Sequence, residues 1–198
     1  MQPRVPCMLI RGGTSKGAYF LAADLPADPA ARDRLILSVM GSPDSRQVDG
    51  LGGAHPLTSK IAIVARSAKP GADVEFLFGQ VLVNEARIDY TPNCGNILAG
   101  IGPFAIERGL IAASDGRTTV RVLTLNTGTL AELTVETPNR RVRYGGAARI
   151  DGVPGTAAPI AVAFMDTEGS VCGALLPTGQ VPEDLRLVPR GEDRGVPL

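Results

Sequence analysis

Residues 97–111 form a run that is apolar on nearly every face until its last turn. A helix with one apolar stripe docks on a surface, whereas a helix that is apolar all round must be enclosed by protein. The run therefore predicts a helix that is enclosed by protein on all sides, and a sheet curled around it would satisfy this. Gly100, Gly102 and Pro103 lie inside the run, and proline inside a helix costs about 3 kcal/mol relative to alanine. We therefore expect a kink or an early irregular turn there, and Gly109 predicts the end of the helix.

Short segments rich in β-forming residues flank this run and predict a mostly antiparallel sheet. We expect strands at residues 5–10, 18–22, 61–65, 74–78, 81–84, 87–89, 118–125, 130–136, 140–144 and 160–165. Residues 126–128 predict a hairpin turn. Asp28 as N-cap, Pro29 at the first helical position and Gly41 as a stop predict one surface helix.

Charge and cysteine content narrow the classes of partner. The chain of 198 residues carries 20 basic and 20 acidic side chains, and no stretch concentrates Lys or Arg with aromatic residues. We therefore expect neither nucleic acid nor a membrane as partner, and no apolar run approaches the length needed to span a bilayer. Cys7, Cys94 and Cys172 lack the spacing of a disulfide framework or a zinc site, so we expect no metal and reduced thiols. Because residues at the N-terminus do not follow a signal-peptide pattern either, we expect a cytoplasmic protein.

The segment Asn93-Cys94-Gly95-Asn96 places a thiol where the apolar helix should begin. Backbone N–H groups at a helix start lower thiol pKa values and can bind a carboxylate, which makes Cys94 a candidate reactive group. The alternative is that Cys94 is a small buried hydrophobe beside an ordinary turn. The local pattern leaves both interpretations open.

Two glycine-rich loops supply further anion-binding groups. The segment 11–17 (RGGTSKG) lacks the spacing and residue order of a P-loop, and the segment 49–53 (DGLGG) leads to a strand instead of the helix of a dinucleotide site. Both loops nevertheless offer N–H groups, hydroxyls and cations that suit carboxylates. His55, the single histidine, is expected to be a loop residue.

The order of these motifs resembles the methylaconitate isomerase (PrpF-like) family. The likeness runs from about Met8 to Gly179 and rests on segments 11–17, 49–53, 58–60 (TSK), 93–96, 102–107 (GPFAIE) and 176–179 (LPTG). It implies an α+β, diaminopimelate-epimerase-like fold with two similar domains, each a curled, mostly antiparallel sheet around a central apolar helix, and an active site between them. It also implies an isomerase without metal, nucleotide or pyridoxal phosphate that moves a proton and a double bond within a small unsaturated tricarboxylic acid.

Residues that match the family's motifs are the candidate site. The resemblance implies that Lys60 and Cys94 are catalytic, with Lys60 as the leading base. A lysine base must be partly neutral at pH 7, which requires a pKa below its usual value of about 10.4. The alternative is a solvated lysine at a strand edge. The substrate-binding candidates are Arg11, Gly13, Thr14, Ser15, Lys16, Thr58, Ser59, Asn93, Gly95 and Asn96. The glycines of segment 11–17 could instead serve only a tight turn.

Length separates this chain from the family members it resembles, which are nearly twice as long. We expect residues 1–165 to be the first domain, and residues 166–198 to be the start of the second domain followed by a divergent, mobile tail. One wall of the cleft would then be missing, and we expect a homo-oligomer or pairing with a chain that supplies the missing domain. Three functions stay open: a keto–enol tautomerase, a cis–trans or double-bond isomerase of a methylaconitate-type tricarboxylate, and a non-catalytic carboxylate-binding or inert fragment.

Overall fold

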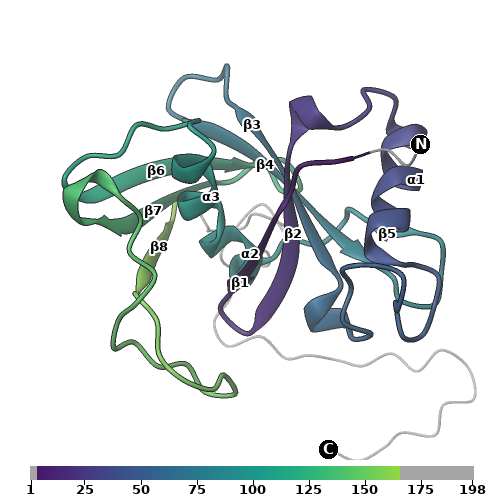
Figure 1. The fold of residues 1–198 in the computed structure, drawn as a ribbon. Helices are drawn as coiled ribbons and strands as arrows, with labels where there is room; N and C mark the ends of the chain where they lie inside the picture. The colour runs from purple at the N-terminus through teal and green to yellow at the C-terminus, as the bar shows by residue number, and fades with distance from the viewer. Residues whose placement is uncertain (1–3, 166–198) are drawn as a thin grey trace, which may run out of the picture. The chain divides into compact units, whose positions relative to one another are not determined.

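A computed structural model of the protein describes residues 4–165. Within this range, eight strands form one curled sheet (Figure 1). The strands are β1 (Met8–Gly12), β2 (Ser15–Leu21), β3 (Lys60–Arg66), β4 (Val74–Val81), β5 (Ile88–Asp89), β6 (Gly116–Thr124), β7 (Leu130–Thr137) and β8 (Ile160–Phe164). Their order is β1-β2-β3-β4-β6-β7-β8, and β5 pairs with β4. Only the β2–β3 and β4–β6 pairs are parallel, so the predicted mostly antiparallel sheet is confirmed.

The central strands bury both of their faces. Tyr19 on β2 and Ala62 on β3 belong to the core that surrounds the central helices. Their chain neighbours Ala18 and Ile61 belong to a second core on the opposite face of the sheet. Successive side chains of a strand point to opposite faces, so a strand buried on both faces is a continuous apolar run, as residues 61–65 are.

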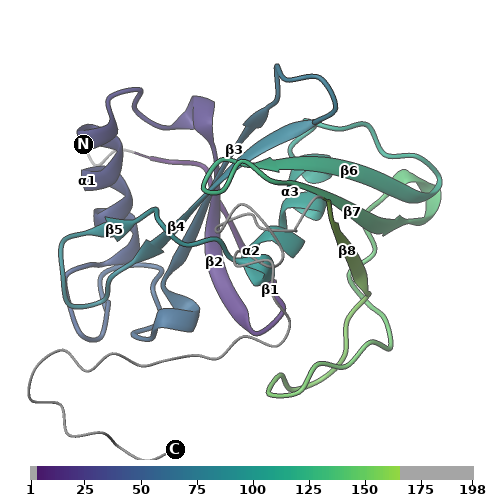
Figure 2. The same cartoon turned by 180° about the vertical axis from the view of Figure 1, so that it is seen from behind.

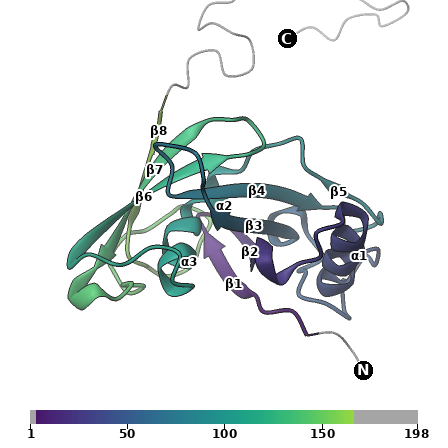
Figure 3. The ribbon, with the colours of Figure 1, turned by 90° about the horizontal axis from the view of Figure 1, so that it is seen from above.

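The apolar run forms two short helices, α2 (Gly95–Ala99) and α3 (Ile101–Glu107), inside the curl of the sheet (Figure 3). They are separated at Gly100, and Pro103 lies in the first turn of α3, where a missing backbone N–H costs no helical hydrogen bond. Gly109 follows α3 with φ +68°. The enclosed helix, its interruption and its glycine stop were all predicted by the sequence.

Helix α1 (Pro29–Met40) covers the other face of the sheet, where its Ile36 and Met40 are buried in the second core. The Asp28 carboxylate accepts a hydrogen bond from the Ala31 N–H at 2.7 Å, and Gly41 adopts the left-handed conformation with φ 77°. Both predicted caps are confirmed.

Two predicted strands are wrong. Residues 81–84 are not a separate strand, because Val81 is the last residue of β4 and the chain then turns, with Leu82 N–H donating to the Arg87 carbonyl. Residues 140–144 have strand-like alternation, but Asn139 and Arg140 take positive φ values that end the ladder after β7. The free side of β7 pairs instead with β8, as predicted for the 160–165 segment.

Candidate active site

The β1–β2 hairpin carries the first group of candidate residues. Gly12 pairs with Ser15, so the turn consists of only Gly13 and Thr14, and Gly13 has φ +52°. The prediction that the whole of segment 11–17 is a loop is wrong, because the strands extend into it from both sides. Arg11 and Lys16 face each other in the hairpin register. The Arg11 guanidinium donates to the Gly13 carbonyl at 2.7 Å and stays exposed.

The start of α2 lies against this turn. The Asn96 side chain donates to the hydroxyls of Thr14 at 3.0 Å and Ser15 at 3.3 Å. A Cβ on Gly12 would lie 1.9 Å from the Asn96 carbonyl oxygen, and one on Gly13 would lie 2.1 Å from its side-chain oxygen. The two glycines therefore permit a close approach as well as a tight turn.

Cys94 is the N-cap residue of α2, as predicted, with extended backbone (φ −144°, ψ 100°). Its side chain makes no capping hydrogen bond and packs, partly buried, against the core around the central helices. The Asn93 side-chain oxygen accepts a hydrogen bond from the Cys94 N–H at 2.8 Å. The thiol is thus at a helix start beside a polar turn, with part of its surface accessible.

Tyr19 on β2 holds helix α2 in place through a hydrogen bond. It is fully buried, and its hydroxyl donates to the Ile97 carbonyl at 2.7 Å. Burial raises the pKa of Tyr19, with a smaller contribution from nearby Cys94, so the phenol stays protonated. We assign Tyr19 a structural role, because its proton is committed to the backbone of α2.

Lys60 begins β3 and is only 8% exposed. Its ammonium group donates to the Gln80 side-chain oxygen at 2.5 Å and lies 5.1 Å from the centre of the Phe78 ring. A lysine over an aromatic face at this distance is in cation–π contact. The structure therefore excludes the interpretation of Lys60 as a solvated surface residue.

The hydroxyls of Thr58 and Ser59 form hydrogen bonds with other residues of the protein. Ser59 is buried, and its hydroxyl accepts a hydrogen bond from the buried Gln47 side chain at 2.7 Å. The Thr58 hydroxyl donates to the His55 carbonyl at 3.2 Å. His55 accepts the Leu57 N–H and is exposed in its loop, as expected. These contacts fix the backbone that leads into Lys60.

Gly17 links the candidate residues of the β1–β2 hairpin to Lys60. It pairs with Lys60 in the parallel β2–β3 register, and a Cβ on it would lie 2.8 Å from the Lys60 carbonyl oxygen and 3.1 Å from the Ile97 side chain. In Figure 1 the hairpin turn, the start of β3 and the start of α2 lie toward the same, lower side of the domain. The structure thus brings segments 11–17, 58–60 and 93–96 together at one end of the sheet.

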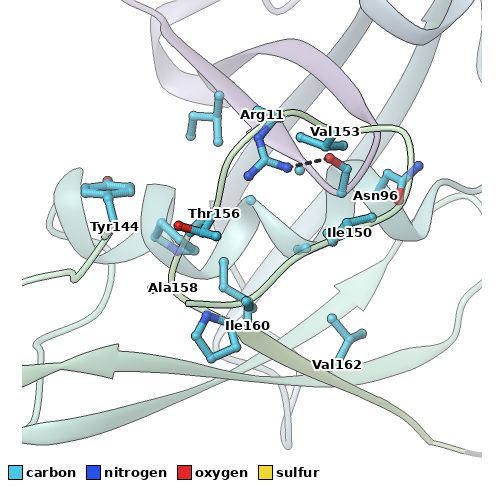
Figure 4. A pocket seen from close by; sticks show the side chains of 18 of the residues that line it. Arg11, Asn96, Tyr144, Ile150, Val153, Thr156, Ala158, Ile160 and Val162 are labelled. Carbon is cyan, nitrogen blue, oxygen red and sulfur yellow. Dashed lines mark hydrogen bonds between the residues drawn. The ribbon is translucent and has the colours of Figure 1, made fainter. Parts of the chain in front are cut away.

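A cavity of about 760 Å³ lies on the outer side of α2, between edge strands β1 and β8 and the segment 143–160. Figure 4 shows Arg11 and Asn96 at one end of it and Ile160 and Val162 from β8 at the other. Of the candidate residues, Arg11, Gly13, Gly95 and Asn96 line this mostly apolar cavity, whereas Lys60 and Cys94 do not. The cavity therefore does not contain the two proposed catalytic groups.

Other predicted features are structural or lie elsewhere. Cys7 is partly buried against the second core, and burial raises the pKa of its thiol despite the opposing effect of Arg108. Cys172, the motif at 176–179 and the predicted tail lie outside the described residues.

Across residues 4–165, no three His, Cys, Asp or Glu side chains are placed to hold a metal ion. The helices of this range are all too short or too polar to cross a bilayer.

Sequence reasoning missed Gln80 and Asn126. Gln80 lies on β4 in register with Lys60, and the alternation Phe76, Phe78, Gln80 could have placed it on the same face of the sheet as Lys60. Asn126 was predicted only as a turn residue. Its side chain binds both backbone groups of Phe78 and the Tyr90 carbonyl, a long-range role for which the sequence carries no signal.

Comparison with known proteins agrees with this architecture. In a solved structure described as methylitaconate-delta-isomerase, the matched part has a TM-score of 0.86 and 49% identity, covering 89% of this chain and 46% of that one. The fold is thus that of the diaminopimelate-epimerase-like isomerases, as predicted. The model of the PrpF protein family matches residues 2–193, and the chain belongs to this family.

Two curated relatives are similar over most of the chain. The (4E)-oxalomesaconate Delta-isomerase of Novosphingobium sp. (strain KA1) is 61% identical over 184 residues, which are 93% of this chain and 52% of the relative. The 4-oxalomesaconate tautomerase of Pseudomonas putida is 61% identical over 178 residues, 90% of this chain and 49% of the relative. The chain spans about half the length of the curated relatives it matches.

Proposed function

We propose that the chain carries one half of the active site of a cofactor-independent isomerase, a keto–enol tautomerase that converts 4-oxalomesaconate to 4-carboxy-2-hydroxymuconate. The observation that carries the proposal is Lys60, a nearly buried amine held against Gln80 and Phe78 beside the start of α2. The 61% identity to relatives named for oxalomesaconate supports the substrate. We place the reaction in gallate breakdown and in the cytoplasm.

The chemistry needs a base next to an activated carbon. Lys60, in its neutral form, accepts the proton from the carbon beside the ketone, and the C–H electron pair becomes the new C=C bond. The ketone oxygen takes up the charge and then a proton, which completes the enol without an outside oxidant or reductant. Removal of a buried general base of this kind lowers turnover by about 10²–10⁴-fold.

Some of the remaining candidate residues bind the three carboxylates in this proposal, and the others position the catalytic groups. Arg11 can pair with a carboxylate through two parallel hydrogen bonds, whereas Lys16 acts as a compact charge. The hydroxyls of Thr14 and Ser15 and the N–H groups of Gly95 and Asn96 supply neutral donors, while Asn93 orients Cys94. Thr58 and Ser59 act through the backbone that positions Lys60.

The role of Cys94 separates this function from a second candidate. A tautomerase returns the proton to oxygen, whereas an isomerase that moves a C=C bond must deliver it to another carbon. The two relatives have equal identity, yet one is named a tautomerase and the other a Delta-isomerase. Cys94, at the helix start, would be the carbon-proton donor in the second case and a substrate-contact residue in the first.

To test the substrate and the reaction, this protein is mixed with a second polypeptide, the half of the Pseudomonas putida relative that this protein does not match. In D₂O, NMR of the product distinguishes the reactions, because tautomerisation leaves no new C–D bond and double-bond migration leaves one. We expect the enol, and kcat/KM at least about tenfold lower for a methylaconitate-type tricarboxylate, since a misfitted carboxylate leaves charged donors unpaired.

Other outcomes would identify the alternatives. A new C–D bond would establish the Delta-isomerase instead. No turnover of either substrate, with thermal stabilisation of the chain by citrate, would indicate a carboxylate-binding module. No turnover and no stabilisation would indicate an inert fragment. Matched controls are the partner chain alone and the Cys94→Ser variant of this chain.

A further inference from the structure

The Gln80 amide has one orientation that satisfies its surroundings. Its nitrogen donates to the carbonyls of Ser59 at 2.9 Å and Pro56 at 3.1 Å. Carbonyl oxygens only accept hydrogen bonds, so the amide nitrogen must face them. The amide oxygen is therefore directed at the Lys60 ammonium, which donates to it at 2.5 Å.

Lys60, Gln80 and Asp89 form one row across the sheet. Gln80 on β4 is directly opposite Lys60 on β3 and opposite Asp89 on β5, and directly opposed residues of antiparallel strands share a face. Gln80 thus separates the lysine from the carboxylate by two strand spacings, about 10 Å. The Asp89 carboxylate accepts hydrogen bonds from the Thr91 N–H and hydroxyl, which hold it toward its own turn.

Within the described part of the chain, the other neighbours of Lys60 supply no counter-ion. Phe78 supplies an aromatic face, and β2 supplies the backbone of Gly17, next to the cationic Lys16. His55 precedes the short helix η2 (Pro56–Thr58) that leads to Ser59. Among residues 4–165, no carboxylate lies within 4.0 Å of the Lys60 ammonium. Within residues 4–165, the Lys60 ammonium is thus held by two neutral partners, the Gln80 amide oxygen and the Phe78 ring.

We propose that Gln80 is a positioning residue of the isomerase site, which aims the Lys60 amine and, being neutral, leaves that amine free to lose its proton. The inference rests on the proposed function only where Lys60 is the base. A carboxylate in place of the amide would bind the ammonium form more strongly and withhold the base. A side chain without a hydrogen-bond acceptor at position 80 would no longer fix the orientation of the Lys60 amine, which would then be in contact only with the Phe78 ring.

The first test needs no turnover. The chain contains three lysines, Lys16, Lys60 and Lys69, so ¹³C-labelled lysine gives signals that Lys60→Ala can assign. In the Gln80→Glu variant we expect the titration midpoint of the Lys60 signal to rise by about one pH unit, a tenfold increase in proton affinity. Thr119→Glu, which adds the same charge at an exposed position of β6, is the control and should leave the midpoint unchanged. An unchanged midpoint in the folded Gln80→Glu variant would overturn the proposal.

The second test uses the assembled enzyme and the Gln80→Met variant, which keeps the side-chain volume and removes the amide. We expect kcat to fall by about 100-fold with KM nearly unchanged, because a misplaced base affects the reaction step more than binding. In the Gln80→Glu variant, the pH–rate profile should move toward higher pH by the same number of pH units as the NMR titration midpoint. Wild-type kcat in Gln80→Met would contradict the positioning role. If the wild-type assembly is inactive, the proposed function fails, and the NMR titration then shows only whether the Gln80 side chain contacts the Lys60 amine.

Discussion

Gly12 and Gly13 mark the closest approach between the β1–β2 hairpin and the start of α2. Their missing side chains let the Asn96 backbone and amide lie where a Cβ would otherwise be. The glycine-rich motif therefore has a packing role that is independent of any bound anion. It sets the distance between the cationic hairpin and Cys94.

We predict that Gly12→Ala destabilises the chain by about 1–3 kcal/mol, because the new methyl group must push α2 away from the hairpin. Urea unfolding measures the change. Gly145→Ala is the control, since a Cβ there meets nothing within 4 Å, and should change stability by less than about 0.5 kcal/mol. Equal effects of the two substitutions would show that the close approach is unimportant.

Motifs in the sequence predict Lys60 and Cys94 as candidate catalytic residues, but they do not reveal the surroundings of either side chain. Lys60 stands at the start of an apolar run, which is also what a surface lysine at a strand edge looks like. Its burial follows from the β3–β4 register, which places Gln80 and Phe78 over it. Register depends on contacts 20 residues away in the chain, and a local pattern does not contain it.

At the scale of elements, Asn126 connects the β6–β7 turn to two other parts of the fold. Its amide bonds both backbone groups of Phe78 and the Tyr90 carbonyl at 2.7–2.9 Å. Tyr90 begins the segment that follows β5 and passes to α2 (Figure 2). The side chain thus continues the hydrogen bonding of β4 and anchors the approach to Cys94.

We predict that Asn126→Ala destabilises the chain by about 2–3 kcal/mol, because it removes three hydrogen bonds and leaves part-buried backbone groups unpaired. The midpoint of urea unfolding measures this loss. The exposed Asn84→Ala provides the comparison and should lie within about 0.5 kcal/mol of wild type. A smaller loss in Asn126→Ala than in Asn84→Ala would refute the anchoring role.

Asp44 gives a pH-dependent prediction for the segment between α1 and β3. Hydrogen bonds from the N–H groups of Val48 and then Arg46 lower the pKa of its carboxyl group. A lowered folded-state pKa stabilises the fold above the unfolded value, 3.8, and this contribution is lost as pH falls through the folded-state pKa. The stability difference between wild type and Asp44→Ala should therefore be constant at neutral pH and shrink below about pH 4. A difference that grows under acid would contradict this sign.

Elements that depend on residues close together in the sequence could be predicted, whereas elements that depend on contacts between distant segments could not. The caps of α1 and the interruption of the apolar run at Gly100 follow from residue types within one turn. The false strand at 140–144 has acceptable alternation, but β8, which follows it in the chain, occupies the free side of β7. Competition between segments for one partner strand is a property of the assembled sheet.

At the scale of the whole described domain, residues 4–165, β1 and β8 end the sheet on either side of the apolar cavity. Leu9 on β1 is 51% exposed, and Phe164 on β8 is 47% exposed. Unpaired edges with apolar side chains favour pairing with another chain. This supports the proposal that the chain self-associates or pairs with a chain that supplies a second domain.

We predict that Leu9→Lys weakens this association by about tenfold without changing the fold, because a charge on an edge strand opposes strand pairing. Light scattering over a concentration series measures the change. Leu125→Lys, at a 45% exposed position beside the β6–β7 turn, should leave the association unchanged. A wild-type chain that is monodisperse and monomeric at all concentrations, alone and with the second-half chain, would contradict the association itself.

The central claim is that Lys60 is the base of a site that a second domain completes. The direct measurement is enol absorbance from 4-oxalomesaconate while the second-half chain of the Pseudomonas putida relative is titrated into a fixed amount of this chain. Turnover should rise to saturation, and the Lys60→Ala chain should saturate at the same ratio with about 10³-fold lower kcat. Wild-type turnover by Lys60→Ala, or no turnover at saturation by the wild-type chain, would contradict the claim.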